Sequence, residues 1–200
     1  MQVETLTTAE GVAIDGPLLL TPRTFGDERG YFYESWNQGV FDAAAGQTVF
    51  VQDNHSRSAP GVLRGLHYQL PPHPQAKLVR CVLGSIYDVA VDIRRSSPTF
   101  GQWVGAELSA DNKRQLWVPA GFAHGFLTLA HHAEVLYKTT DLWSRDCERS
   151  IRWDDPQLAI AWPLEACAGS SQPISAPVLS SKDAAAPGFA EAVAAGGVFA

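Results

Sequence analysis

Short segments in which apolar and polar residues alternate dominate the chain from Gly16 to about Trp162. The clearest example runs from Val79 to Ile93, where every second residue is apolar or aromatic on both sides of the Gly-Ser pair at 84–85. Successive side chains of a strand point to opposite faces, so this pattern predicts strands with one buried face. A two-residue Gly-X connection between such runs predicts a β-hairpin.

The same alternation, punctuated by Gly, Pro, Asn and Asp, marks nine further candidate strands: Leu18–Pro22, Tyr31–Ser35, Thr48–Asn54, Val62–Gln69, Trp103–Leu108, Gln115–Pro119, Gly125–Leu129, Ala133–Thr139 and Ile151–Trp153. Helical periodicity is limited to Gln38–Ala45 and Asp183–Ala195. Many short strands with few helices predict an all-β sandwich or barrel.

The chain shows no internal repeat and no linker, so we expect a single domain over residues 1–200. The segment 166–176, rich in Ser, Ala, Gly and Pro, is typical of a surface loop. The Ala- and Gly-rich end after about residue 188 is a candidate for a mobile terminus.

Composition narrows the function classes. The chain is 46% hydrophobic and 18% charged, as in an ordinary globular protein, and its net charge of -6 disfavours nucleic-acid or membrane-surface partners. It does not exclude a small anionic ligand. The three cysteines form no CxxC pair, the first residues lack a signal-peptide pattern, and no apolar run approaches the roughly 20 residues of a membrane span. We therefore expect a cytoplasmic protein.

Two ionisable side chains lie in consecutive candidate strands, His67 in the interior of one and Lys77 at the start of the next. Alternation places His67 on one face of the strand 62–69, next to Gly65 and Leu66, and Lys77 opens the following strand. A histidine at such a place is either a structural core residue or a group that titrates near neutral pH for catalysis. A lysine at a strand end is usually solvated, so Lys77 alone indicates little.

His124 and Tyr137 are the other candidates for acid–base chemistry. His124 lies among the small and aromatic residues of the stretch PAGFAHGF (119–126), where a partly desolvated imidazole can donate to a ligand oxygen. Tyr137 lies within the strand 133–139, where its hydroxyl is either a packing feature at the rim or a proton donor. For both residues the structural alternative stays open at this point.

The histidine spacing argues against a metal site. His67 is followed two residues later by Gln69, so the His-x-His pair common in barrel-type metal proteins is missing. Asp27, Glu28, Asp88 and Asp92 are each interpreted as solvated or structural. Since an open metal site typically needs three protein ligands, we expect neither a metal nor any other cofactor. The cations near strand ends, a subset of which would suit a diphosphate, are Arg29, Arg64, Arg80, Arg94 and Lys182.

Six longer stretches are more distinctive than any single residue: FGDERGYFYESWN (25–37), FVQDNHSRS (50–58), GVLRGLHYQ (61–69), KLVRCVLGSIYDVAVDIRRSSPTFGQWVGAELSADNKRQLWVPAGFAHGFLTL (77–129), EVLYKTTDLW (134–143) and LSSKDAAAP (179–187). In this order they resemble the dTDP-4-dehydrorhamnose 3,5-epimerase family. The similarity spans about Gly26 to Pro187, nearly the whole chain.

The resemblance implies a cupin-type jelly-roll sandwich, a homodimer that exchanges N-terminal strands, and a dTDP-4-dehydro-6-deoxy-glucose substrate epimerised at C3 and C5. It implies His67 of RGLH as the catalytic base, Tyr137 of LYK as the acid and Asp183 of SKD as the residue that orients the base. Lys77 and His124 match residues near the sugar. Such chemistry removes a proton next to the C4 ketone, and Lys77 would stabilise the enolate that forms.

The nucleotide contacts that the resemblance implies fall on Arg29, Phe32, Glu34, Gln52, Asn54, Arg64, Glu148 and Lys182, with Trp143 stacking on thymine. The family often has two neighbouring tyrosines where this chain has Leu142 and Trp143. Strict alternation puts Arg64 and His67 on opposite faces, and a bulge or bend at Gly65 would let both reach one cavity.

Four other functions remain compatible with these residues. The first is an epimerase acting at C3 only or C5 only on a related dTDP-4-keto-6-deoxy sugar, and the second is a ketoisomerase on the same barrel. The third is a sugar-nucleotide binding module without catalysis. The least expected is a metal-dependent cupin oxygenase.

Overall fold

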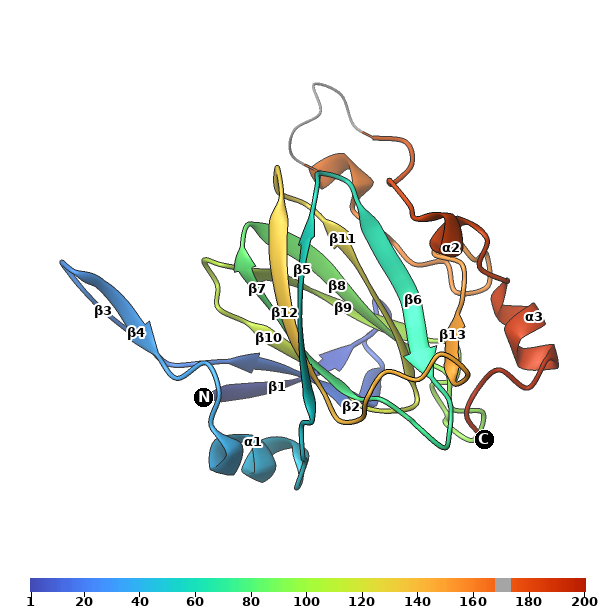
Figure 1. Cartoon of the computed structure of the whole chain (residues 1–200), viewed down its shortest axis with the longest axis horizontal. Coiled ribbons are helices and arrows are strands. Elements are labelled where there is room, and N and C mark those ends of the chain that lie inside the picture. The colour runs from blue at the N-terminus through green and yellow to red at the C-terminus, as the bar shows by residue number, and fades with distance from the viewer. Residues whose placement is uncertain (168–173) are drawn as a thin grey trace.

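Two antiparallel β-sheets face each other in the computed structural model of the chain, which describes residues 1–167 and 174–200 (Figure 1). In its order across the sheet, the six-stranded sheet contains β1 (Gln2–Thr7), β2 (Ala13–Thr21), β10 (Gln115–Val118), β7 (Lys77–Leu83), β12 (Ala133–Thr139) and β5 (Gln52–Ser58). The five-stranded sheet contains β13 (Glu148–Ser150), β6 (Leu63–Gln69), β11 (Phe122–Thr128), β8 (Ser85–Asp92) and β9 (Trp103–Ser109). The predicted all-β sandwich is confirmed.

Apolar side chains fill the space between the sheets and also cover both outer faces. Val79 and Leu116 of one sheet meet Ile86 and Ala90 of the other in the central cluster. Outside the five-stranded sheet, a second cluster joins its strands to the C-terminal segments. Because both faces of β8 and β11 are covered, their residues are almost all buried, unlike the half-exposed strands of an open sheet.

The strands at 79–93 are present, but they do not form the predicted hairpin. β7 pairs with β10 and β12, whereas β8 pairs with β11 and β9, so the turn at Gly84 carries the chain from one sheet to the other. Alternation reports which face of a strand is buried and not which strand lies beside it. The short connection is therefore a crossover between sheets.

Helix predictions are confirmed at one end of the chain and corrected at the other. α1 (Gln38–Ala45) forms as predicted, begins after the cap residue Asn37, and packs Phe41 edge-on against Trp117 of the six-stranded sheet. The predicted helix 183–195 is two helices, α2 (Ser181–Ala184) and α3 (Phe189–Ala194). Pro187 separates them, because proline lacks the backbone N–H that a continuous helix needs.

Other differences between the structure and the sequence-based expectations concern one loop, two strands and the C-terminal end of the chain. One short helical turn, η1 (Leu164–Ala166), precedes residues 168–173, which lie outside the described residues although the predicted surface loop 166–176 includes them. The predicted strand 151–153 is replaced by β13, three residues earlier, and β1 was not predicted. After residue 188 the composition indicated a mobile end, yet Phe189 and Val198 are buried there and Tyr68 of β6 donates to the Gly197 carbonyl.

A two-stranded hairpin projects away from the sandwich. It consists of β3 (Thr24–Asp27) and β4 (Gly30–Tyr33) and extends beyond the body of the chain in Figure 1. Three of its four aromatic side chains, Phe25, Tyr31 and Phe32, are exposed, and Tyr33 is half-buried. Large apolar side chains on a projecting element indicate a surface that another molecule covers.

Candidate active site

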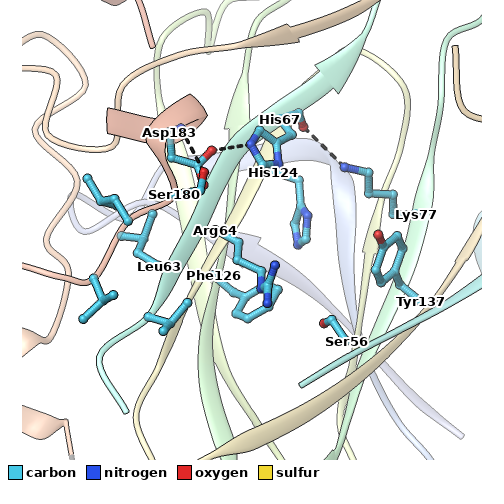
Figure 2. A pocket seen from close by; sticks show the side chains of 13 residues that line it. Ser56, Leu63, Arg64, His67, Lys77, His124, Phe126, Tyr137, Ser180 and Asp183 are labelled. Atoms are coloured by element: carbon cyan, nitrogen blue, oxygen red, sulfur yellow. Dashed lines mark hydrogen bonds and ion pairs between the residues drawn. The ribbon is translucent and has the colours of Figure 1, made fainter. Parts of the chain in front are cut away.

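A cavity of about 480 Å³ opens between the two sheets. The four residues expected to be catalytic all line it: His67 from β6, Lys77 from β7, Tyr137 from β12 and Asp183 from α2. Figure 2 shows these side chains together with Arg64 and His124, which also line the cavity. Segments 116 positions apart in the sequence thus meet at one place, as the pairing of His67 with Asp183 demonstrates.

A bulge in β6 brings Arg64 and His67 to the same cavity. In the pairing with β11, Phe126 lies opposite Arg64 and His124 lies opposite His67. The interval from Arg64 to His67 on β6 is therefore one residue longer than the interval from His124 to Phe126 on β11. Gly65 has φ +129°, and a Cβ atom there would lie 2.5 Å from the Cα of Gly125. Only glycine permits this close approach. The bend at Gly65, which the sequence permits without requiring it, is present.

His67 and Asp183 form a closely paired imidazole and carboxylate. The distance from His67 Nε2 to Asp183 Oδ1 is 2.5 Å, and Ser180 donates to the other carboxylate oxygen at 2.8 Å. Burial alone would raise the pKa of Asp183, but the hydrogen bonds from His67 and Ser180 and the charge of His67 together hold this pKa below its ordinary value. An ionised Asp183 binds the N–H at Nε2 and leaves the lone pair of His67 at Nδ1.

Lys77 is a buried amine at the wall of the cavity. Its side chain is almost fully shielded from solvent, and Nζ donates to the carbonyl of His67 at 3.4 Å. Burial lowers the pKa of Lys77 to about 8, against the opposing charges of Asp88 and Glu148. At neutral pH most of this amine is therefore protonated, and a cation in a desolvated site acts strongly on nearby charge.

His124 contacts a carboxylate that sequence reasoning did not select. His124 Nε2 lies 2.7 Å from Oδ1 of Asp88, and Asp88 is fully buried. Burial lowers the pKa of His124, although the charge and hydrogen bond of Asp88 oppose this effect. Of the two alternatives for Asp88, solvated or structural, the structure agrees with the second. The available signal was a carboxylate inside the otherwise apolar run 86–91.

Tyr137 approaches the cavity from the sheet opposite His67. In the six-stranded sheet it pairs with Val79 of β7 and with Asn54 of β5. Burial and the negative charge of Glu148 raise the pKa of Tyr137, and together they outweigh the positive charge of Arg64, which lowers it. The phenol therefore stays protonated at neutral pH and can donate a proton.

Five of the residues expected to contact the nucleotide lie close to one another near the cavity. Trp143, 57% exposed, donates its backbone N–H to Gln52 Oε1 at 3.2 Å, and Gln52 in turn donates to Asn54 at 2.9 Å. Glu148 forms an ion pair of 2.7 Å with Lys182. Burial raises the pKa of Glu148, but hydrogen bonds from Lys182 and Trp143 bring it below its ordinary value. This group of Gln52, Asn54, Trp143, Glu148 and Lys182 is called the rim below.

Three other expected nucleotide contacts do not reach this cavity. Arg29 and Phe32 belong to the projecting hairpin and line a separate shallow hollow on it. Arg29 pairs with Asp27 at 2.6 Å, and its side chain is 85% exposed. Glu34 follows the hairpin and accepts from Asn37. One chain therefore brings together the catalytic residues and the rim, but not the hairpin residues.

Within residues 1–167 and 174–200, no three His, Cys, Asp or Glu side chains gather in a way that could hold a metal ion. In the same ranges no helix has the length and apolar character needed to span a bilayer.

The family model for dTDP-4-dehydrorhamnose 3,5-epimerase matches residues 11–191. A dTDP-4-dehydrorhamnose 3,5-epimerase of Pseudomonas aeruginosa is 58% identical over 185 residues, which cover 92% of this chain and 97% of the relative. The structure of dTDP-6-deoxy-D-glucose-3,5-epimerase from Legionella pneumophila, in complex with dTDP-4-keto-L-rhamnose, is 48% identical with a TM-score of 0.81, over 94% of this chain and 93% of that one.

A second solved structure is similar over the whole chain. The rmlC epimerase of Mycobacterium tuberculosis has a TM-score of 0.89 and 41% identity, and the match covers 100% of this chain and 94% of that one.

Proposed function

The chain belongs to the dTDP-4-dehydrorhamnose 3,5-epimerase family. On this basis, we propose a role in the epimerisation reaction for each residue of its candidate active site. The chain is an isomerase of rhamnose biosynthesis that epimerises C3 and C5 of dTDP-4-dehydro-6-deoxy-glucose, and its fold is the cupin-like sandwich. One observation carries the assignment of roles: a histidine–carboxylate pair and a protonated tyrosine approach one cavity from opposite sheets.

The reaction sets three requirements. A base must remove the proton from a carbon next to the C4 ketone, a donor must return a proton from the opposite face, and a charged group must stabilise the enolate oxygen at C4. No oxidation or reduction takes place, since each carbon loses and regains a proton.

His67 is the base. The carboxylate of Asp183 at Nε2 fixes the neutral tautomer with its lone pair at Nδ1, and it stabilises the imidazolium that forms when the proton is taken. A positioned base of this kind contributes roughly 10²–10⁴-fold to the rate.

Tyr137 is the proton donor. It comes from β12 in the six-stranded sheet, whereas His67 comes from β6 in the five-stranded sheet, so the two groups are suited to opposite faces of a sugar held between them. The increased pKa of Tyr137 keeps the phenol protonated until the enolate accepts the proton.

Lys77 stabilises the enolate. Its ammonium lies beside the base, as the contact of Nζ with the His67 carbonyl shows, and the buried setting strengthens its interaction with charge that develops at O4. Removing one such donor from an oxyanion site typically costs roughly 3–4 kcal/mol of transition-state stabilisation. His124 and Arg64 complete the polar wall around the sugar.

The nucleotide end of the substrate is assigned to the rim and to a second copy of the chain. The indole of Trp143 offers a flat face for thymine, and Lys182 and Arg64 offer cations for the diphosphate. Arg29, Phe32 and Glu34 lie outside the cavity of their own chain, on or next to a hairpin with exposed aromatic side chains. A homodimer that exchanges these N-terminal strands would bring each hairpin to the partner's rim.

The alternatives are less well supported. Epimerisation at one carbon only is not favoured, because the relative with 58% identity is named as a 3,5-epimerase. A binding module without catalysis would not require the pairing of His67 with Asp183 at the cavity wall. A cytoplasmic location, with no nucleic acid or membrane partner, fits the net charge of -6 and stays part of the proposal.

The test is incubation with dTDP-4-dehydro-6-deoxy-glucose in deuterium oxide, followed by proton NMR. We expect deuterium at both C3 and C5 and formation of dTDP-4-dehydro-rhamnose. Exchange at a single carbon would support the single-site alternative, and binding of dTDP without any exchange would support the binding module.

A further inference from the structure

Asp88 is a buried carboxylate for which the roles assigned above have no use. It comes from the middle of β8, is fully shielded from solvent, and points into the space between the sheets beside Phe126 and His124. One carboxylate oxygen accepts from His124 Nε2. The other, Oδ2, is buried and has no hydrogen-bond partner among the described residues. A buried charged group left half-satisfied is costly, which indicates a role beyond packing.

We propose that Asp88 is a positioning residue of the active site, whose carboxylate is the buried counter-ion of the Lys77 ammonium and the anchor of the His124 ring. This inference rests on the proposed function, since it concerns the group assigned to the enolate oxygen. It assigns Asp88 no direct contact with the substrate.

The balance of charge around Asp88 supports this role. Because burial lowers the pKa of His124, the ring is mostly neutral at neutral pH and does not cancel the charge of the carboxylate. Lys77 is the buried cation that faces the same interior from β7 (Figure 2). The carboxylate of Asp88 and the ammonium of Lys77 offset each other's charge in this interior, whereas either charge alone would be strongly disfavoured.

The groups around Lys77 act on its charge with different strengths. Burial lowers its pKa to about 8, Asp88 is the strongest influence in the opposite direction, Glu148 of β13 acts likewise, and Lys182 of α2 acts against them. The other ionisable groups at the cavity wall are His67, His124, Tyr137, Arg64 and Asp183. Without Asp88, the Lys77 amine should lose its proton at a lower pH.

The hydrogen bond to Asp88 also fixes the His124 ring. With Nε2–H donated to Oδ1, the neutral ring keeps its lone pair at Nδ1. His124 then presents an acceptor, suited to a hydroxyl of the sugar, and the developing negative charge at O4 is left to Lys77. His124, which Asp88 holds, and Lys77 thereby have complementary hydrogen-bonding roles.

The experiment compares Asp88→Asn with the wild type and with Asp92→Asn. Asp92 is a matched control because it is a fully buried carboxylate on the same strand that pairs with Arg94 away from the cavity. The dependence of kcat/KM on pH is measured for each protein, together with kcat and KM at pH 7.5 and with the affinity for dTDP. Circular dichroism checks the fold.

A reaction that needs protonated Lys77 is fast below the pKa of this amine and slows as the pH rises through it. In Asp88→Asn we expect this alkaline decline to begin about one pH unit lower, with kcat at pH 7.5 reduced about threefold and dTDP affinity within about twofold of wild type. The difference in kcat between Asp88→Asn and the wild type should be smaller at pH 6, because Lys77 is mostly protonated in both proteins there. Asp92→Asn should keep the wild-type alkaline decline.

An Asp88→Asn enzyme with the wild-type alkaline decline, or with the same loss at every pH, would overturn the proposal. Lys77→Arg gives a test that does not depend on the folding of an Asp88 variant. A guanidinium stays protonated, so the alkaline decline near pH 8 should disappear, and its persistence would also overturn the proposal. If wild-type protein exchanges no deuterium at all, the proposed function fails instead.

Discussion

Arg64 and His67 are separated by three positions on β6, and both side chains line the same cavity. An unbroken strand would direct them to opposite faces. The bulge opposite β11 removes this conflict, and it depends on the contact between Gly65 and Gly125. The phosphate-binding candidate and the base are thus oriented by the same local irregularity.

Gly65→Ala should therefore disrupt both the fold and the site. The new Cβ would lie 2.8 Å from the His124 carbonyl oxygen, as well as against Gly125, at a φ that side chains rarely adopt. We expect the free energy of unfolding, measured with urea, to fall by about 3 kcal/mol or more. Gly196→Ala is the control, because its φ is also positive but nothing lies within 4 Å, and it should cost only about 1 kcal/mol.

His67→Ala should lower the rate of deuterium uptake from solvent at both C3 and C5 by at least about 100-fold, while the fold is retained. NMR in deuterium oxide measures both positions in one sample. His73→Ala is a suitable control, since His73 is half-exposed and pairs with Asp141 rather than with a residue of the cavity. Uptake at either carbon in His67→Ala would mean that another base acts there.

Tyr137→Phe should separate the two halves of the reaction. Because His67 still removes protons, some deuterium exchange should persist, whereas epimerised product should fall by about 100-fold. Chromatography of the products, combined with the NMR measurement, distinguishes the two effects. Tyr87→Phe, on the outer face of the five-stranded sheet next to Trp162, should behave as wild type. Normal turnover in Tyr137→Phe would transfer the donor role to another group.

Mixed dimers test whether the hairpin serves the partner's cavity. Arg29→Ala and His67→Ala homodimers should each be weakly active. A heterodimer of the two, purified through different tags, should recover about half of the wild-type activity, since one cavity then combines an intact base with an intact hairpin. An inactive heterodimer would indicate that each hairpin serves its own chain.

The buried pair of Asp92 and Arg94 predicts a loss of stability in acid. Burial raises the pKa of Asp92, but hydrogen bonds from Arg94, Ser97 and Thr99 outweigh it and hold the pKa below its ordinary value near 4. The stabilisation is present above that value and is lost as the pH falls through the pKa of the folded state. Asp92→Asn should cost about 1.5–3 kcal/mol at pH 7, measured by urea unfolding. The difference in the free energy of unfolding between Asp92→Asn and the wild type should become smaller in acid. A difference that does not change with pH would contradict this account.

The sequence was sufficient to place most strands and to select the residues that line the cavity. Alternation identified β12 without error, and the stretch around His67 carried enough resemblance to select His67, which lines the cavity, as the candidate base. The pairing of strands was not accessible in the same way. At Gly84 the pattern on both sides is that of a hairpin, and only the strand pairing in the structure shows that β7 and β8 enter different sheets.

Two features of the site lay beyond sequence reasoning for different reasons. Asp88 interrupts an apolar run, but nothing in that run identifies its partner, and only the structure places His124 2.7 Å away. Arg29, Phe32 and Glu34 were grouped with the nucleotide contacts by resemblance, yet no periodicity could reveal that they lie on or beside a hairpin that leaves the body of their own chain.

The candidate catalytic residues line the cavity between the sheets, whereas part of the rim is exposed, and this difference affects how the nucleotide specificity of such an enzyme can change. The groups assigned to proton transfer are embedded between two sheets, whereas Trp143 and its neighbour Leu142 are open to solvent. Because Trp143 is the residue proposed to stack on thymine, we expect substitutions at 142 and 143 to alter the preferred base of the nucleotide without disturbing the core. Laboratory evolution towards uridine- or guanosine-linked sugars should therefore begin at these two positions.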